Sequence, residues 1–349
     1  MTISNGGTFT GSASVIAGSI TVSGGGSTLN NTAAVVLSSG SITVTNGGTI
    51  TGPGFLTINN ADGNGDPKVF LNTANSYSFG TTVLGSSVAV GNSSSFGTGS
   101  VSLSNEFGTL GPTPSKVRFD ANNINLGNIF FISDANIFDL NGTSGVISGQ
   151  ISDLDTNIGP IPGTLDIRKG VLQLSGVNAY SGGTLVNSAT VRVTNDSSIG
   201  SGAITLNNGT FQAGVNNLSF ANNFVLPTGS GGSIDTNGNT LTLSGLLNGS
   251  GSLSKIGAGA LNLTASGSNV GALSNLAGTL AIASGASLTA STFSNAATTS
   301  VAGSLTSVGL LTNSGSLSVS GVLTAANVTN TGTITNTGTI RMRSPTAGP

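Results

Sequence analysis

Apolar residues alternate with Ser, Thr and Asn in short segments along the whole chain. GSITVTNGGTIT from Gly40 sets Ile42, Val44 and Ile50 in this pattern around an Asn-Gly, and SSVAVGN from Ser86 continues it. Alternation puts one set of side chains on one face, so these segments predict short β-strands. In ATVRVTN from Ala189, it predicts that Val191 and Val193 both point into a core and Arg192 points outward.

Long helices are not expected, because the 55 glycines are spread through the chain. An interior glycine costs a helix about 1 kcal/mol relative to alanine. The best helical candidate, ALSNLAG from Ala272, covers one turn at most. Asn-Gly pairs mark corners, because both residues tolerate positive φ. They begin at Asn5, Asn46, Asn64, Asn141, Asn208, Asn237 and Asn248.

Short strands with frequent corners fit either tandem antiparallel sandwiches or a β-solenoid. An internal duplication bears on the choice: residues 77–103 align without a gap on residues 180–206, and about half of the positions are identical. Sandwich modules are normally separated by linkers, and no linker is visible, so the solenoid is favoured. At about 20 residues per coil, the chain makes on the order of 15 coils.

A hexapeptide occurs twice in succession in TNTGTITNTGTI, from Thr329 to Ile340. In a solenoid, each copy would form one side of a coil, a corner from Asn and Gly followed by a short strand, with Ile334 and Ile340 in the core. We expect one continuous β-solenoid over residues 1–340 and a disordered tail over 341–349. A coil edge exposes unpaired backbone groups. Either the chain is cut from a longer rod or neighbouring copies complete its ends. We expect a homo-oligomer or fibre joined through the solenoid ends, with Arg341 and Arg343 at the seam.

The composition removes several function classes. The chain contains no Cys, His or Trp, only 6% of its residues are charged, and the net charge is −2. Cysteine-based zinc sites, thiolate nucleophiles and the usual serine triad are therefore excluded. The chain has no basic footprint for nucleic acid and no apolar run long enough to span a bilayer, so we expect neither nucleic-acid binding nor membrane insertion by this chain.

Two segments resemble the passenger-associated transport repeat, also described as the autotransporter-associated β-strand repeat, of bacterial autotransporter passenger domains. Leu172 to Phe211 contains the Asn-x-Tyr-Ser-Gly-Gly-Thr element, and GSGSLSKIGAGALNLT from Gly249 resembles the other half of the repeat. The clearest match covers residues 50–265, although Phe79 stands where the motif has its first glycine. The motif residues, which we expect to be structural, are Asn75, Tyr77, Gly80, Asn178, Tyr180, Gly182, Gly183, Gly257 and Gly259.

The resemblance implies a right-handed parallel β-helix, a single elongated rod that is exported and displayed extracellularly or on the bacterial outer surface. It does not specify an activity. Tyr77 and Tyr180 recur in matching positions, which indicates packing rather than a sugar-stacking platform. We interpret Lys255 of the repeat motif as a capping or surface residue.

One charge-rich zone is the candidate for chemistry. Paired carboxylates could serve a β-helix polysaccharide lyase or glycosidase, which needs two carboxyls roughly 5 to 9.5 Å apart. The duplicate copy mostly lacks these carboxylates, so a solvated face with Asp corners is the favoured reading. The zone spans residues 120–166 and contains Asp120, Asp134, Asp139, Asp153, Asp155 and Asp166, flanked by Lys116, Arg118, Arg168 and Lys169.

Two acidic loops are weaker candidates for calcium. Asp62, Asn64 and Asp66 in one loop, and Asp153, Asp155 and Asn157 in the other, place oxygen side chains at alternate positions. Both loops lack the glycine and the terminal glutamate of an EF-hand, so plain turns are favoured and no cofactor or metal is expected.

Together, these features predict a non-enzymatic, extracellular or cell-surface β-solenoid with a structural or adhesive role and a contact to a host surface or matrix. The alternatives are the polysaccharide lyase or glycosidase and a self-assembling fibre subunit.

Overall fold

The computed structural model describes residues 1–15, 18–59, 66–108, 111–156 and 159–343. Within these residues every regular element is a β-strand, and no helix is long and apolar enough to cross a membrane. The chain divides into two compact units. Unit 1 comprises Met1–Thr184 with Ser197–Ser201, and unit 2 comprises Leu185–Asp196 with Gly202–Pro349.

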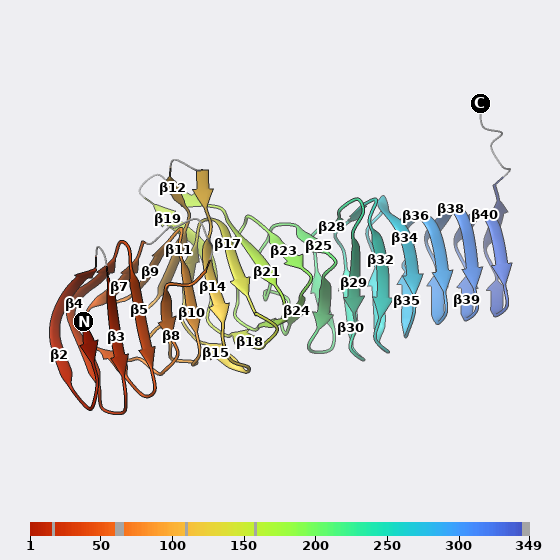
Figure 1. The fold of residues 1–349 in the computed structure, drawn as a ribbon. Coiled ribbons are helices and arrows are strands. Elements are labelled where there is room, and N and C mark those ends of the chain that lie inside the picture. Colours follow the sequence, from red (N-terminus) through yellow and green to blue (C-terminus); the bar gives the residue numbers. More distant parts are fainter. Residues whose placement is uncertain (16–17, 60–65, 109–110, 157–158, 344–349) are drawn as a thin grey trace. The chain divides into compact units, whose positions relative to one another are not determined.

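The strands of unit 1 form three main sheets (Figure 1). The first contains, in spatial order, β1 (Thr2–Ile3), β3 (Ser19–Ser23), β5 (Ser41–Thr45), β8 (Val69–Leu71), β10 (Ser87–Val90), β14 (Ser115–Phe119), β17 (Asp134–Asp139) and β21 (Gly163–Arg168). The second contains β2 (Thr8–Val15), β4 (Thr28–Leu37), β7 (Phe55–Ile58), β9 (Gly80–Leu84), β11 (Val101–Ser104), β16 (Phe130–Ile132) and β19 (Ile151–Thr156), with β6 (Thr49–Thr51) beside β4. The third contains β15 (Ile124–Leu126), β18 (Ser144–Ile147) and β22 (Val171–Leu174).

The pairings within these three sheets are parallel, as in β10 with β14 and β14 with β17. Two short antiparallel hairpins depart from this pattern. One joins β12 (Glu106–Gly108) to β13 (Gly111–Thr113), and the other joins β19 to β20 (Gly159–Ile161). Each hairpin is an insertion into a turn of the solenoid.

Unit 2 repeats the three-sheet arrangement. One sheet contains β23 (Thr184–Asn187), β25 (Ile204–Asn207), β28 (Phe224–Leu226) and β31 (Leu247–Gly249). The next contains β24 (Thr190–Val193), β26 (Thr210–Ala213), β29 (Gly231–Asp235), β32 (Ser252–Ile256), β34 (Ser268–Asn275), β36 (Ser287–Asn295), β38 (Ser304–Asn313), β40 (Val322–Asn330) and β42 (Thr339–Met342). The last contains β27 (Leu218–Phe220), β30 (Thr240–Leu243), β33 (Ala260–Leu263), β35 (Thr279–Ile282), β37 (Thr298–Val301), β39 (Ser316–Val319) and β41 (Thr333–Asn336).

The parallel sheets stack as a β-solenoid of about 16 turns in all, so the predicted fold class is confirmed and antiparallel sandwiches are excluded. The helical candidate from Ala272 is wrong, since its first four residues complete strand β34. The corner prediction holds at Asn5, Asn46, Asn141, Asn208 and Asn237, all of which have positive φ. At Asn248 the following Gly249 takes the positive φ instead.

The core consists of columns of apolar side chains that repeat once per turn. Val191 and Val193 are completely buried while Arg192 between them is not, so the predicted register of this strand is confirmed. At the far end of unit 2, Leu305 pairs with Leu323, and Leu323 pairs with Ile340. Each inward residue needs an apolar neighbour in the turn before it and in the turn after it. The alternation of apolar and polar residues in the sequence therefore reflects these columns.

The two hexapeptides of TNTGTITNTGTI form two successive sides of a turn. Thr333–Asn336 is β41 in one sheet and Thr339–Met342 is β42 in the next. Ile334 pairs with the buried Leu317, and Ile340 with the buried Leu323. Both isoleucines continue core columns, as expected from the repeat, but they are half-buried rather than fully buried. The corner between the strands needs glycine, because a Cβ on Gly338 would lie 2.3 Å from the carbonyl oxygen of Gly321.

Candidate functional site

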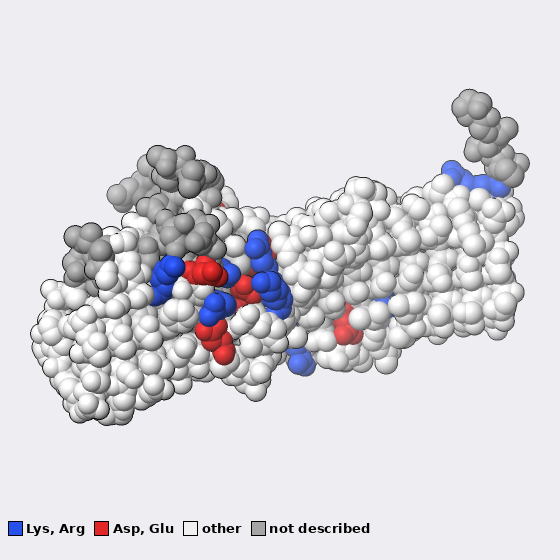
Figure 2. All heavy atoms as spheres, viewed as in Figure 1, with Lys and Arg blue, Asp and Glu red and all other residues white. Residues whose placement is uncertain are grey.

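Seven of the ten charged residues from Lys116 to Lys169 gather on the outer surface of unit 1 (Figure 2). Three neighbouring parallel strands carry them. Arg118 on β14 pairs in register with Asp139 on β17, which pairs with Arg168 on β21. We call the group the charged patch, and it consists of Lys116, Arg118, Asp120, Asp139, Asp166, Arg168 and Lys169.

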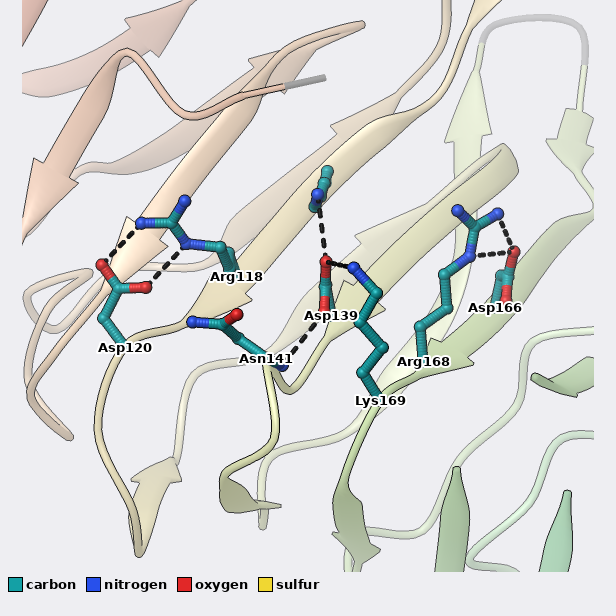
Figure 3. Close-up of polar contacts among 8 residues, drawn as sticks. Arg118, Asp120, Asp139, Asn141, Asp166, Arg168 and Lys169 are labelled. Carbon is teal, nitrogen blue, oxygen red and sulfur yellow. Dashed lines mark hydrogen bonds and ion pairs between the residues drawn. The ribbon is translucent and has the colours of Figure 1, made fainter. Parts of the chain in front are cut away.

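Asp139 is the centre of the charged patch (Figure 3). Its Oδ2 lies 3.1 Å from Lys116 Nζ and 3.6 Å from Lys169 Nζ, and its Oδ1 accepts a hydrogen bond of 3.0 Å from the backbone N–H of Asn141. Burial acts to raise the pKa of Asp139, since its side chain is only 4% exposed. The lysines and the Asn141 N–H outweigh burial, and the pKa lies below its ordinary value.

The other two carboxylates of the patch each hold one arginine. Arg118 donates from Nε to Asp120 Oδ1 at 2.6 Å and from NH2 to Oδ2 at 2.8 Å. Its guanidinium also lies 5.8 Å from the ring centroid of Phe70, within the range of a cation–π contact. Arg168 donates from Nε and NH2 to Asp166 Oδ2, at 2.9 and 2.6 Å. All three carboxylates of the patch are therefore matched to cations.

The structure does not bring together all of the carboxylates named from the sequence. Asp134 lies at the start of β17, where its φ is 54°. Asp153 and Asp155 lie on β19, which belongs to the second sheet. The reading of this zone as a solvated face is also incomplete, because the Asp139 and Asp166 side chains are only 4% and 10% exposed. Long basic side chains cover them, which the sequence pattern does not reveal.

Asp153 closes the base of the β19–β20 hairpin. Its Oδ1 accepts hydrogen bonds from the backbone N–H groups of Gly163 and Ser181, at 2.8 and 3.0 Å, and its Oδ2 accepts one of 2.6 Å from the Ser181 hydroxyl. The carboxylate is thus engaged with protein donors, and Asp155 is exposed on the hairpin. We infer that Asp153 fixes the hairpin to the following turn.

The other calcium candidates are only partly open to description. Asp62, Asn64 and Asn157 lie outside the described residues, and Asp66 is exposed. Among the residues that the structure describes, no group of three or more acidic side chains could hold a metal ion.

The Asn-x-Tyr element of the repeat holds successive turns together. Asn178 Oδ1 accepts the backbone N–H of Ile151 from the preceding turn at 2.7 Å, and its Nδ2 donates to the carbonyl of Ser198 in the following turn at 2.5 Å. In the first copy, Asn75 makes the same two bonds, with Ile50 and Ser95, both at 2.8 Å. In both copies, the asparagine side chain therefore links the backbone of the preceding turn to that of the following turn, at a position outside the strands.

The tyrosines of this element are buried parts of the turn. Tyr77 and Tyr180 are completely buried, and each hydroxyl lies 2.6 Å from the hydroxyl of the threonine four residues later, Thr81 or Thr184. Burial raises the pKa of both phenols, that of Tyr180 to about 12. Neither ring is accessible for stacking on a sugar.

The glycines of the element allow close approach between turns. Gly80 and Gly183 have φ of 121° and 100°, and a Cβ on Gly182 would lie 2.7 Å from the carbonyl oxygen of Gly163. The motif therefore describes the geometry of a turn and the spacing of its neighbours.

A second interior network was missed by the sequence reasoning. Asn275, Asn295, Asn313 and Asn330 pair in register on β34, β36, β38 and β40. Each Nδ2 donates to the Oδ1 of the next asparagine, at 3.0, 2.7 and 2.7 Å, and we call this row the asparagine ladder. Its first three members are buried, and their Nδ2 groups also bond carbonyls of the following turn, those of Thr298, Ser316 and Thr333.

The signal for the asparagine ladder was present in the segments SNLAGT, SNAATT, TNSGSL and TNTGTI. The sequence pattern predicts a corner at the asparagine of TNTGTI, but Asn275, Asn295 and Asn313 of the related phrases end strands and are buried. Its recurrence at nearly equal spacing is the feature that distinguishes a ladder from a set of unrelated turns.

Lys255 occupies the ladder column one turn earlier, since it pairs in register with Asn275. The side chain is completely buried, so its interpretation as a surface residue is wrong. Alternation with Leu253 places it on the inner face of β32, although its charge predicted the opposite. Burial lowers the pKa of Lys255 to about 8, and the negative charge of Asp235 acts in the other direction.

Comparisons with known protein families, with curated proteins and with solved structures find no match for this chain.

Proposed function

We propose that the chain is a non-enzymatic structural or adhesive β-solenoid that acts extracellularly or on the bacterial outer surface. Two features support this proposal. The side chains that recur between turns, Asn75 and Tyr77 in one copy and Asn178 and Tyr180 in the other, are engaged in holding turns together. The repeat motif also resembles that of exported autotransporter passengers.

We assign the contact surface of this solenoid to the charged patch. The observation that supports this assignment is the difference in exposure between Arg168 and Lys169 and the carboxylates that they contact. The Arg168 and Lys169 side chains are 42% and 66% exposed, whereas those of Asp166 and Asp139 are 10% and 4% exposed. Arg168 and Lys169 therefore face solvent while Asp166 and Asp139 lie beneath them, whereas Arg118 and Asp120 are about equally exposed, at 23% and 20%. Such a surface attracts an anionic polymer at moderate salt, even though the net charge of the chain is −2.

Binding to an immobilised carboxylated polysaccharide, such as polygalacturonate, tests this assignment. We expect the wild-type protein to bind at low salt and to dissociate as the salt concentration rises. The double variant Arg168→Gln/Lys169→Gln should bind at least about tenfold more weakly, a change equivalent to 1.4 kcal/mol. The matched control is Arg341→Gln/Arg343→Gln, which removes the same charge from exposed residues outside the patch.

Equal losses in both double variants would show attraction by overall charge and would contradict the patch assignment. The same incubation tests the enzymatic alternative. The polysaccharide should keep its chain length, and shortening that disappears in Asp139→Asn would overturn the non-enzymatic proposal.

A second candidate, association through the solenoid ends into oligomers or fibres, is favoured by strands β41 and β42. Their inward residues Ile334 and Ile340 continue buried columns yet remain half-buried. Sedimentation of the wild-type protein over a wide concentration range tests it, with Ile334→Lys/Ile340→Lys as the comparison. A wild-type protein that stays monomeric at high concentration would contradict this candidate.

A further inference from the structure

The ammonium group of Lys255 is enclosed by more oxygen atoms than it has N–H donors. Its Nζ lies 2.6 Å from the carbonyl oxygen of Gly257, 2.7 Å from that of Ala277 and 2.8 Å from that of Gly259. The hydroxyl of Thr236 at 3.0 Å and the carbonyl of Ile256 at 3.2 Å complete the group. We call these five oxygens the oxygen cage.

The oxygen cage spans three successive turns of unit 2. Thr236 follows β29, Ile256 to Gly259 form the corner after β32, and Ala277 follows β34. An ammonium group has three N–H bonds, so five oxygens surround it as they would surround a spherical cation rather than as partners of directed bonds. Four of the five distances, 2.7 to 3.2 Å, are longer than those of calcium, about 2.3 to 2.6 Å, and the fifth is 2.6 Å.

Glycine is required for this convergence. Gly257 has φ of 77°, and a Cβ there would lie 2.3 Å from Asp235 Oδ1. Gly278 has φ of 68°, and a Cβ there would lie 2.6 Å from Lys255 Nζ. The Lys-x-Gly-x-Gly segment therefore supplies the cation and three of the four carbonyl groups that enclose it.

A further buried oxygen lies next to the cage. Asn275, the register partner of Lys255, is completely buried, and its Oδ1 has no hydrogen-bond partner. The first acceptor of the asparagine ladder thus remains unsatisfied on the residue paired with Lys255. A buried, unpaired acceptor is costly, and it favours positive charge nearby.

We propose that the oxygen cage is a binding site for a monovalent cation of about the size of potassium, and that the chain fills it with its own tethered ammonium group. Rings of backbone carbonyls select such cations by replacing their hydration shell. Below about pH 8, Lys255 therefore acts as a tethered ion that joins three turns at the start of the asparagine ladder. Without the lysine, the cage should accept a free potassium or ammonium ion.

Thermal unfolding of Lys255→Ala in different chloride salts at equal ionic strength tests this inference. We expect potassium or ammonium chloride to raise the unfolding midpoint by about 3 °C or more over tetramethylammonium chloride, whose cation is too large for the cage. The wild-type protein should show no such difference. Lys255→Met should show none either, because a side chain still fills the oxygen cage. An equal midpoint for Lys255→Ala in all three salts would overturn the proposal.

If Lys255→Ala does not fold in any of the salts, the neutral variants decide the question. Lys255→Gln keeps two N–H donors for the cage and Lys255→Met keeps none. We expect the glutamine variant to unfold at the higher temperature. The opposite order would show that the position needs only apolar volume, and would overturn the assignment of a cation site.

Discussion

Two regions of the molecule differ in the length of their stacked turns and in the interactions that join one turn to the next. In the last part of unit 2, Leu288 pairs with Leu305 and Leu305 with Leu323, so these turns take 17 or 18 residues. In unit 1, Ser87 pairs with Lys116 and Ile137 with Asp166, so these turns take 29 residues. The additional residues of the long turns include the β12–β13 and β19–β20 hairpins, and the strands that follow the hairpins, β14 and β21, carry much of the charged patch.

The stabilising interactions differ accordingly. The short turns have an interior amide row and no charged residue between residues 256 and 340. The long turns have ion pairs on the outer surface of a sheet. Buried hydrogen bonds in a row are strengthened by the low local dielectric, whereas exposed ion pairs contribute little. We therefore infer that the uncharged turns serve to keep the stacking of the solenoid regular, and that the charged turns serve to contact another molecule.

Replacement of the middle rung of the ladder should have the largest effect on this comparison. Asn295→Ala removes the donor to Asn313 Oδ1, which stays buried without that partner, and one acceptor of Asn275 Nδ2, which keeps the carbonyl of Thr298. We expect the free energy of unfolding to fall by about 3 kcal/mol, since each buried unsatisfied group costs about 1 to 3 kcal/mol. Chemical denaturation measures the loss.

The matched control for the ladder variant is Asn262→Ala. Asn262 lies on β33 and makes one long contact of 3.5 Å, from Nδ2 to Thr242 Oγ1. A loss of less than about 0.5 kcal/mol is expected there. Similar losses in both variants would mean that the inward row is no more important than an outward asparagine.

Loss of the central carboxylate of the charged patch should have an intermediate effect. Asp139→Asn leaves Lys116 and Lys169 without their shared partner, and we expect the free energy of unfolding to fall by about 2 kcal/mol. The control Asp66→Asn changes an exposed carboxylate and should cost almost nothing. A loss as large as that of Asn295→Ala would contradict the distinction between the two regions.

The contribution of Asp139 to the free energy of unfolding should also depend on pH. The pKa of Asp139 is lowered in the folded state, so the unfolded state binds more protons in the window below the unfolded value, about 3.9. The contribution of Asp139 is fully present above that value and is lost as the pH falls through the folded pKa. We therefore expect the stability difference between wild type and Asp139→Asn to shrink below about pH 4. A difference that persists unchanged at low pH would exclude the ionised carboxylate as its source.

Much of the fold could be predicted from the sequence, because alternation and the Asn-Gly corners report local geometry. Val191 and Val193 were placed correctly, as were the two hexapeptide strands. What failed was the assumption that polar and charged residues lie outside. Lys255 and Asn295 are buried because neighbouring turns supply carbonyl and amide partners, and single-sequence alternation shows the face of a strand but not those partners.

The candidate site was predictable only as a stretch of sequence. Charge density identified residues 120–166, but the division between Asp139 on β17 and Asp153 on β19 depends on which sheet each strand joins. Strand β18 lies between them in sequence, and β21, the strand after the β19–β20 hairpin, returns to the first sheet. Carboxylates a few residues apart can therefore serve separate purposes, one under a basic surface and one at the base of a hairpin.

The smallest effect on stability should come from the most exposed ion pair. Arg168 holds Asp166 by two contacts, but its side chain is 42% exposed, so water replaces much of what Arg168→Gln removes. Exposed pairs typically contribute about 0 to 1 kcal/mol, and we expect a loss of about 0.5 kcal/mol that disappears at high salt. A double-mutant cycle with Asp166→Asn isolates the pair from the other contacts of Asp166. A coupling free energy above about 2 kcal/mol would show that outward ion pairs, like the inward ladder, hold the turns together, and the charged patch would then be a structural element rather than a surface kept for contact.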